Sequence, residues 1–206
     1  MKMKELVAVV LVCITLQVKS QDTLRYDEGP IKAIGANNDM GKKGSWKHYY
    51  KDGVVSAAFV YSDDLLDGDQ YYYWPNGNLS AQEHWTEGSI QDSAFYFYEN
   101  RVIHRKGIYD HSLYEGLWLF YDESGNLKQE GSYVEGIPSG LWLTYFPSGQ
   151  VKEEGFYYAG LKEGNWRFFN ESGQLTFEGG FVADLKSGQW WRYTKKVKRK
   201  KWRNFD

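Results

Sequence analysis

Glycine, aromatic and aliphatic residues recur along this chain with a fixed spacing of 24 residues. In the unit that begins at Gly116, Trp118 stands two residues after the first glycine, and Gly125 and Leu127 follow nine and eleven residues after it. The first position of the unit is glycine in five further copies, at Gly44, Gly68, Gly140, Gly164 and Gly188. No insertion interrupts this register, and a fixed period of this length is typical of a repeat array in which each unit packs on its neighbours.

Each unit contains two strand-like segments separated by turn residues. Residues 117–121 and 127–134 are rich in aromatic and branched side chains, which favour strands. The turn between them carries glycine, and elsewhere proline, in the positions that hairpin turns require. No segment has a sustained helical period. The sequence therefore predicts an all-β fold, an elongated array of antiparallel β-hairpins in a single twisted sheet of about 14 strands.

The spacing also predicts contacts between strands. A tight turn places Tyr121 opposite Leu127, and an equally tight second connection places Tyr133 opposite Trp142. Gly131 lies on the same strand and leaves a gap on that face. We expect a neighbouring aromatic ring to cover this gap.

The repeat aromatics raise the question of which face of the sheet they occupy. Trp118 and Tyr121 are three residues apart, so in a regular strand they point to opposite faces. Either both faces carry aromatics or a bulge lies between the two residues, and we favour the bulge. In residues 95–98 the run of four rings places aromatics on both faces directly, which makes Tyr96 and Tyr98 candidate contacts for a partner.

The second and third units depart from the pattern. Gln70 and Ala94 replace the tryptophan, Glu83 replaces a glycine, and Arg101 takes the place of a turn glycine. Loss of the repeat pattern can mark a binding site, but ordinary drift in a tolerant array also explains it. We favour drift.

The first 20 residues have the pattern of a secretory signal peptide. Lys2 and Lys4 precede an apolar run over residues 6–16, and small or tolerated residues precede a cleavage site before Gln21. The run is too short to cross a bilayer, which takes about 20 residues. Cys13, the only cysteine, would be removed with the peptide. We therefore expect an exported protein, periplasmic, outer-surface or secreted, without disulfides.

The pattern divides the chain into four parts: a signal peptide (1–20), an N-terminal half repeat (21–43), an array of six full units and a C-terminal half unit (44–195), and a basic tail (196–206). The formal net charge is -2, with an acidic body and a basic end. The candidate contacts in the tail are Lys196, Lys198, Arg199, Lys200, Lys201 and Trp202. Such a segment could touch an anionic surface, or it could be a solvated, disordered end.

No group of residues predicts a catalytic or metal site. The four histidines lie at different positions of the repeat without ligand-like spacing, and residues 110–112 hold triad residue types without a nucleophile elbow. There is no phosphate loop and no dinucleotide fingerprint. We expect no enzyme activity and no cofactor, and no nucleic acid partner for an exported protein.

The spacing G-x-W-x-x-Y, followed by x-x-x-G-x-L and x-x-x-G-x-Y, resembles the MORN repeat family in the variant form found in many bacterial proteins. The resemblance covers residues 26 to 195 and is only partial in the second and third units. It implies stacked β-hairpins and roles in interaction or membrane association instead of catalysis. Some bacterial members carry an antitoxin label, but an antitoxin meets its toxin in the cytoplasm, which the signal peptide argues against.

These observations predict a non-catalytic, exported binding scaffold for a protein partner or a component of the cell envelope. One alternative is a glycan or cell-wall binding module that stacks sugars on repeat aromatics. Solvent exposure decides that alternative, and the rings concerned are Trp118, Trp142, Trp166 and Trp190. A second alternative is an antitoxin-like component of a toxin-antitoxin system. The oligomeric state stays open.

Overall fold

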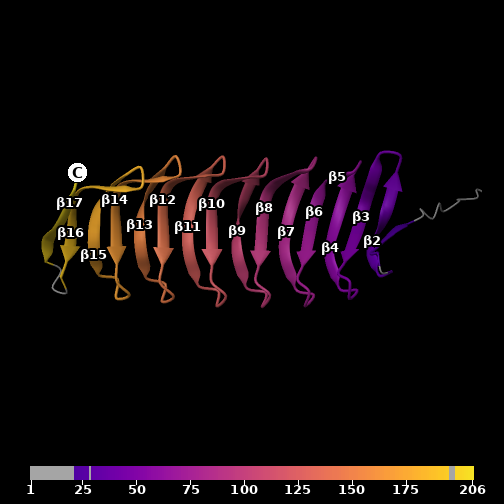
Figure 1. The fold of residues 1–206 in the computed structure, drawn as a ribbon, viewed down its shortest axis with the longest axis horizontal. Helices are drawn as coiled ribbons and strands as arrows, with labels where there is room; N and C mark the ends of the chain where they lie inside the picture. The colour runs from indigo at the N-terminus through magenta and orange to yellow at the C-terminus, as the bar shows by residue number, and fades with distance from the viewer. Residues whose placement is uncertain (1–20, 28, 195–197) are drawn as a thin grey trace, which may run out of the picture.

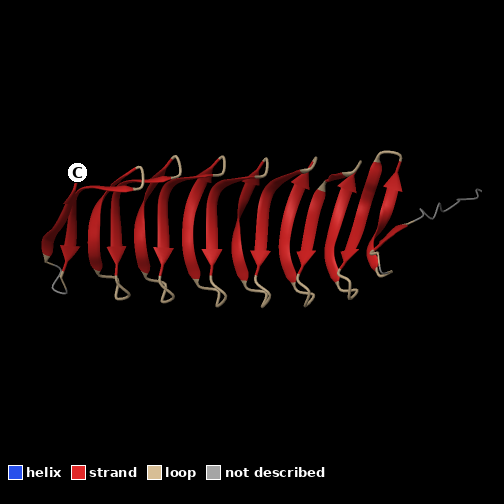
Figure 2. Cartoon of the chain, viewed as in Figure 1, coloured by secondary structure: helices blue, strands red, loops and turns tan. Residues whose placement is uncertain are grey.

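The computed structural model describes residues 21–27, 29–194 and 198–206, and these residues form one antiparallel sheet of 17 strands without a helix (Figures 1 and 2). Apart from β5, each strand pairs with the next along the chain, so the sheet is a simple meander. The two-residue strand β5 lies beside β4, which also pairs with β6. The strands are β1 Asp22–Arg25, β2 Ile31–Asn38, β3 Gly41–Tyr49, β4 Val55–Ser62, β5 Leu65–Leu66, β6 Gly68–Tyr73, β7 Leu79–Thr86, β8 Ser89–Phe97, β9 Ile103–Asp110, β10 Leu113–Tyr121, β11 Leu127–Val134, β12 Ile137–Tyr145, β13 Val151–Tyr158, β14 Leu161–Phe169, β15 Leu175–Val182, β16 Leu185–Tyr193 and β17 Arg199–Phe205. The predicted all-β array of antiparallel hairpins in a single sheet is confirmed, with more strands than the 14 expected.

Five-residue turns line one edge of the array, which is the lower edge in Figure 1. In the turn after β10, the Asp122 N–H donates to the Asn126 carbonyl and the Gly125 N–H donates to the Asp122 carbonyl, both at 3.0 Å. Gly125 has a φ of 87°, which side chains other than glycine rarely adopt. The same two hydrogen bonds recur in the turns that begin at Tyr26, Tyr50, Trp74, Tyr98, Phe146 and Asn170. We name this edge the turn edge.

The predicted register is correct across the turn and wrong across the second connection. Tyr121 faces Leu127, as expected. Trp142 faces Gly131 and not Tyr133, because the pairing shifts by two residues between Gly131 and the next residue of β11. Gly140 and the residue after it form the bulge, and the φ of 75° at Gly140 permits it. Tyr133 still contacts Trp142 diagonally and edge-on, with ring centroids 5.2 Å apart.

Both faces of the sheet carry aromatic rings. A one-residue register shift does fall between Phe120 and Tyr121, where we favoured a bulge. Even so, Tyr121 lies on the face away from Trp118. Lys106, which pairs with Leu119, has its ammonium 5.9 Å from the centre of the Tyr121 ring. The structure therefore has both features that we treated as alternatives: a bulge beside Tyr121, and aromatic rings on both faces of the sheet.

A row of buried indoles forms the core. Each tryptophan at the second position of a unit covers a glycine on the preceding strand, so the predicted coverage of the glycine gaps is confirmed. Each indole N–H also donates to the backbone carbonyl ten residues earlier, at 3.0 to 3.2 Å. The glycine and tryptophan pairs are Gly35 and Trp46, Gly107 and Trp118, Gly131 and Trp142, Gly155 and Trp166, and Gly179 and Trp190.

The burial of these indoles decides the glycan alternative for the rings concerned. The four named tryptophans, 118, 142, 166 and 190, are at most 6% exposed. Rings of tyrosine or phenylalanine lie edge-on between them, as Tyr157 does between Trp142 and Trp166 at centroid distances of 5.5 and 5.3 Å. A sugar cannot stack on rings that the protein already covers, so this form of glycan binding is excluded.

The two ends of the array differ from the expectation. Residues 199–205 form β17, paired with β16 from Tyr193 opposite Arg199 to Gly188 opposite Phe205, so the basic end is a strand and the array extends beyond residue 195. At the other end, β1 pairs with β2, so residues 21–43 contain a hairpin with a short first strand. The predicted signal peptide and Lys196 lie outside the described residues.

Candidate functional site

An exposed apolar surface runs along one face of the sheet, from β9 to β16. Its members alternate with the inward rings, so they face away from the indoles. Leu141, for example, pairs with Phe156 while the adjacent Trp142 pairs with Gly155. Each member is 41 to 74% exposed. We name this surface the apolar row, and it consists of Ile108, Leu113, Leu117, Val134, Ile137, Leu141, Phe156, Tyr158, Leu161, Val182 and Leu185.

The apolar row follows from the repeat and joins neighbouring hairpins. Val134 pairs with Ile137, and the same positions one unit later are Tyr158 and Leu161. Because these residues flank the connections between units, the repeat brings them together on adjacent strands. Sequence reasoning did not identify this surface, although apolar residues on both sides of the inward aromatic positions were a visible signal.

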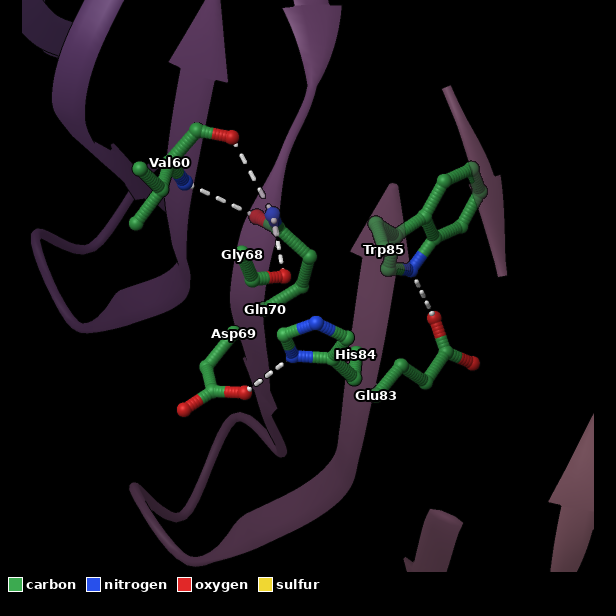
Figure 3. A network of polar contacts seen from close by, with 7 residues as sticks. All are labelled: Val60, Gly68, Asp69, Gln70, Glu83, His84 and Trp85. Atoms are coloured by element: carbon green, nitrogen blue, oxygen red, sulfur yellow. Dashed lines mark hydrogen bonds and ion pairs between the residues drawn. The ribbon is translucent and has the colours of Figure 1, made fainter. Parts of the chain in front are cut away.

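Gln70 replaces a tryptophan and makes the hydrogen bond that the indole makes elsewhere. It is fully buried, and its amide Nε2 donates to the Val60 carbonyl ten residues earlier at 3.1 Å and to the Gly68 carbonyl at 3.0 Å (Figure 3). The Val60 N–H donates in turn to Gln70 Oε1 at 2.8 Å. A glutamine can both donate and accept, so it satisfies both backbone groups of Val60.

Glu83 takes the position of a glycine where Ala94 takes the position of a tryptophan. The carboxylate of Glu83 is buried, with the residue 7% exposed, and it accepts hydrogen bonds from Trp85 Nε1 at 2.9 Å (Figure 3) and from the Tyr96 hydroxyl at 2.7 Å. The Tyr96 and Tyr109 hydroxyls are 2.9 Å apart. Burial, reinforced by its hydrogen bonds with Tyr109 and Glu83, raises the pKa of Tyr96, so its hydroxyl stays protonated. Burial also raises the pKa of Tyr109.

The departures from the repeat are therefore coupled in pairs. Where the ring is lost at position 70 or 94, the glycine eleven residues earlier is also lost, to Phe59 and Glu83 respectively. The side chain at the glycine position fills the space that the missing ring leaves. Gln70, Ala94 and Glu83 are all at most 7% exposed, so these positions stay buried despite the exchange.

The structure does not bring Tyr96 and Tyr98 together as one contact surface. Tyr96 belongs to the buried hydrogen-bond network of Glu83. Tyr98 lies at the turn edge, where its hydroxyl donates to the Tyr121 carbonyl at 2.9 Å and its ring packs on His104 with centroids 4.6 Å apart.

The basic strand β17 divides into structural and exposed side chains. The guanidinium of Arg199 lies 3.3 Å from Glu178 Oε1 and 3.7 Å from the centre of the Trp191 ring. Trp202 is 44% exposed and packs against Phe177 at 5.1 Å between ring centroids. The lysines at 198, 200 and 201 are exposed. These three lysines are the part of the predicted contact set that stays free to meet an anionic surface.

No group of three or more histidine, cysteine, aspartate or glutamate side chains in the described ranges is arranged to hold a metal ion. The described residues also contain no helix long and apolar enough to cross a membrane.

Comparison with known proteins identifies the repeat. The model of the MORN repeat variant matches residues 66–87, 114–135, 138–157 and 162–183. No curated protein matches the chain. Among solved structures, a chain of the crystal structure of TcdB2-TccC3-Cdc42 is similar at 11% identity over 87% of this chain, with a TM-score of 0.18. The match spans only 13% of that chain's length.

Proposed function

This chain belongs to the MORN repeat family, and from that premise we propose that it is a binding scaffold on whose apolar row a protein partner docks. The observation that carries the proposal is the apolar row itself. Contiguous exposed apolar surface on a soluble protein is typical of an interaction site. With strands about 4.8 Å apart, the row from β9 to β16 extends over about 34 Å, which suits a partner segment lying across the strands.

The scaffold is proposed to act by binding alone. MORN repeats are generally non-enzymatic, and the buried carboxylate of Glu83 has both oxygens engaged by Trp85 and Tyr96. We further propose that the scaffold works after export, in the periplasm, on the outer surface or in the medium, because residues 1–20 have the pattern of a signal peptide. Fractionation of cells that express the full chain with a C-terminal tag tests the location, and retention of the uncleaved chain in the cytoplasm would contradict it.

Capture of partners from a cell-envelope fraction tests the docking surface. The variant combines Leu117→Ser, Leu141→Ser and Phe156→Ser, three exposed positions whose substitution leaves the indole row intact. The control combines Lys128→Ser, Lys152→Ser and Glu171→Ser, which are exposed residues outside the apolar row. We expect a protein that the wild type and the control retain and the variant loses. If the variant captures the same proteins in the same amounts, the apolar row is not the docking surface.

The exposed lysines in and just before β17 favour a second candidate function, attachment to an anionic envelope surface. Deleting the basic end would remove β17 and uncover β16, so substitution is the cleaner test. Replacing Lys198, Lys200 and Lys201 by glutamine should abolish sedimentation with vesicles containing phosphatidylglycerol, and the wild type should release them as salt rises. Equal sedimentation of the wild type with neutral vesicles would contradict the role. Nothing among the described residues favours the antitoxin-like alternative.

A further inference from the structure

A cavity of about 360 Å³ opens beside the Glu83 network, on the face that carries the indoles. It lies where the second and third units depart from the repeat. Strands β6 to β9 and the turn after β6 supply its lining, which consists of Tyr72, Trp74, Ser80, Ala81, Glu83, Tyr96, Phe97, His104 and Arg105. Its size is within the range of cavities that hold small organic molecules.

Arg105 is the cation in the lining of this cavity. Its guanidinium carbon lies 4.0 Å from the centre of the Tyr96 ring, and its Nε is buried with no hydrogen-bond partner. No ion pair joins it to a carboxylate in the described part of the chain. Arg105 pairs with Tyr96 on one side and Phe120 on the other, so its immediate strand neighbours offer rings and no anion. The terminal Nη atoms are not among the buried unpartnered atoms, and a bound anion could pair the charge of the guanidinium through them.

The other polar groups of the lining leave Arg105 available to a ligand. Both oxygens of Glu83 already accept hydrogen bonds, from Trp85 and Tyr96. Burial, with a smaller contribution from the Arg105 charge, lowers the pKa of His104, so its imidazole is neutral at neutral pH. The hydroxyl of Ser80 adds a further donor at the wall. Arg105 thus supplies the charged donor of this lining.

The remaining walls are apolar and aromatic. Trp74 has its indole N–H engaged by the Phe97 carbonyl at 3.1 Å, so its ring is held in place as a wall of the cavity. Ala81 completes the apolar lining, and Phe97 contributes the backbone carbonyl that holds the indole. From these features together we infer that the cavity binds a small organic carboxylate, with the carboxylate on Arg105 and the apolar body against Trp74 and Ala81. This site is on the face opposite the apolar row and does not depend on the docking proposal.

Three small probes test the inference on the full mature chain. Benzoate supplies both features, benzamide keeps the shape without the charge, and inorganic phosphate supplies an oxyanion without an apolar body. Titrations followed by the NMR signal of the Arg105 Nε–H should show saturable binding of benzoate. Binding of benzamide and of phosphate should be at least 10-fold weaker. Benzamide binding as tightly as benzoate would overturn the carboxylate site, and phosphate binding as tightly would overturn the choice of an organic ligand.

Substitution of the anchor supplies a second, independent test. Arg105→Gln should weaken benzoate binding at least 10-fold, measured by calorimetry, and Arg105→Lys should weaken it less because the charge remains. The matched control is Lys106→Gln on the adjacent residue, whose ammonium lies over Tyr121 on the opposite face, and its affinity should stay within twofold. Unchanged benzoate affinity in Arg105→Gln would overturn the assignment. If that variant fails to fold, the comparison of the three probes on the wild type still decides it.

Discussion

The indole of Trp142 occupies the space into which a side chain at Gly131 would point. A Cβ added to Gly131 would overlap the indole atoms Cδ2 and Cε2, and the same overlap occurs in the other four glycine and tryptophan pairs of the array. Gly131 also faces Trp142 directly in the strand register. The glycine is therefore required by the close approach of the ring and not by its own backbone conformation, because its φ lies outside the left-handed region.

Substitution of Gly131 by alanine tests this close approach. The added methyl group must displace the Trp142 ring, so we expect a loss of about 1–3 kcal/mol in the free energy of unfolding, which is the usual cost of overpacking. Urea unfolding followed by tryptophan fluorescence measures it. Ser132→Ala, on the next residue of β11, keeps the carbonyl that Trp142 Nε1 uses and should change stability by less than about 0.5 kcal/mol. Equal effects of the two substitutions would contradict the explanation.

Restoring glycine at position 83 and tryptophan at position 94 tests whether these two positions share one space in the core. Ala94→Trp alone drives an indole into Glu83, and Glu83→Gly alone leaves the donors of Trp85 and Tyr96 without their acceptor. Both single variants should therefore be destabilised. The double variant should recover stability, with a coupling energy of about 0.5–3 kcal/mol in a double-mutant cycle.

The control cycle replaces the second substitution by one at a distance. Glu87→Gly lies in an exposed turn at a φ of 48°, where glycine is well tolerated, and its effect should add to that of Ala94→Trp. Strict additivity of Glu83→Gly and Ala94→Trp would show that the two positions do not share the space.

One tyrosine hydroxyl at the turn edge can be removed and an equivalent one added two units later, so the same hydrogen bond is tested by its loss and by its gain. Tyr98→Phe removes the hydrogen bond to the Tyr121 carbonyl and should cost about 1 kcal/mol. Phe146 stands two units later at the same position, so Phe146→Tyr should add the equivalent bond to the Phe169 carbonyl and raise the unfolding midpoint. Thermal unfolding measures both changes. A destabilising Phe146→Tyr would show that the C-terminal half of the turn edge is built differently.

The Tyr145 hydroxyl should titrate far above its ordinary range. Burial, together with the hydrogen bond to Glu130 Oε1 at 2.6 Å and the charge of that carboxylate, raises the pKa of Tyr145 to about 12. The unfolded pKa of tyrosine is about 10, so the folded state favours the protonated form. The resulting stability is fully present below pH 10 and is lost as the pH rises from about 10 to about 12.

Glu130→Gln should lower the pKa of Tyr145 toward 10 while leaving the contribution of burial in place. Titration of tyrosine Cζ signals by NMR measures the shift. Glu171→Gln, in an exposed turn, is the control and should leave the Tyr145 signal unchanged. A pKa that stays near 12 in Glu130→Gln would assign the whole shift to burial.

The period of the sequence predicted the architecture because every strand and turn is set by local chemistry. Gly125 in its turn, Tyr121 opposite Leu127 and the covered gap at Gly131 all followed from spacing alone. The second connection did not, because a tight turn predicts no bulge there, whereas Gly140 opens a two-residue bulge. A glycine in the sequence shows that a positive φ is possible at this position. Whether the backbone adopts it depends on the contact between neighbouring hairpins, which the sequence does not show.

The candidate site was less accessible to sequence reasoning. Glu83 and Ala94 are separated by the same eleven residues as Gly131 and Trp142, so the spacing contained the signal of their exchange. What the spacing could not supply is the environment of Arg105, which depends on side chains from four strands. The strand β17 was missed because Arg203 stands where the repeat has glycine. No later tryptophan follows to cover that position in the described array, while Phe205 still fits the aromatic position seventeen residues after Gly188.

The hydrogen bonds at the turn edge give the array a mechanical polarity. Side chains at the first turn position bind the next hairpin from Tyr26 to Tyr49, Tyr50 to Tyr73, Trp74 to Phe97 and Tyr98 to Tyr121. The later turns that the structure describes begin with Asp122, Phe146 and Asn170, and none of these side chains makes such a bridge. Side-chain hydrogen bonds therefore connect neighbouring hairpins along the turn edge in the first half of the array and not in the second half that the structure describes. A load that bends the sheet should therefore separate neighbouring hairpins at the turn edge first from about residue 122 onward, while the N-terminal half moves as one rigid unit.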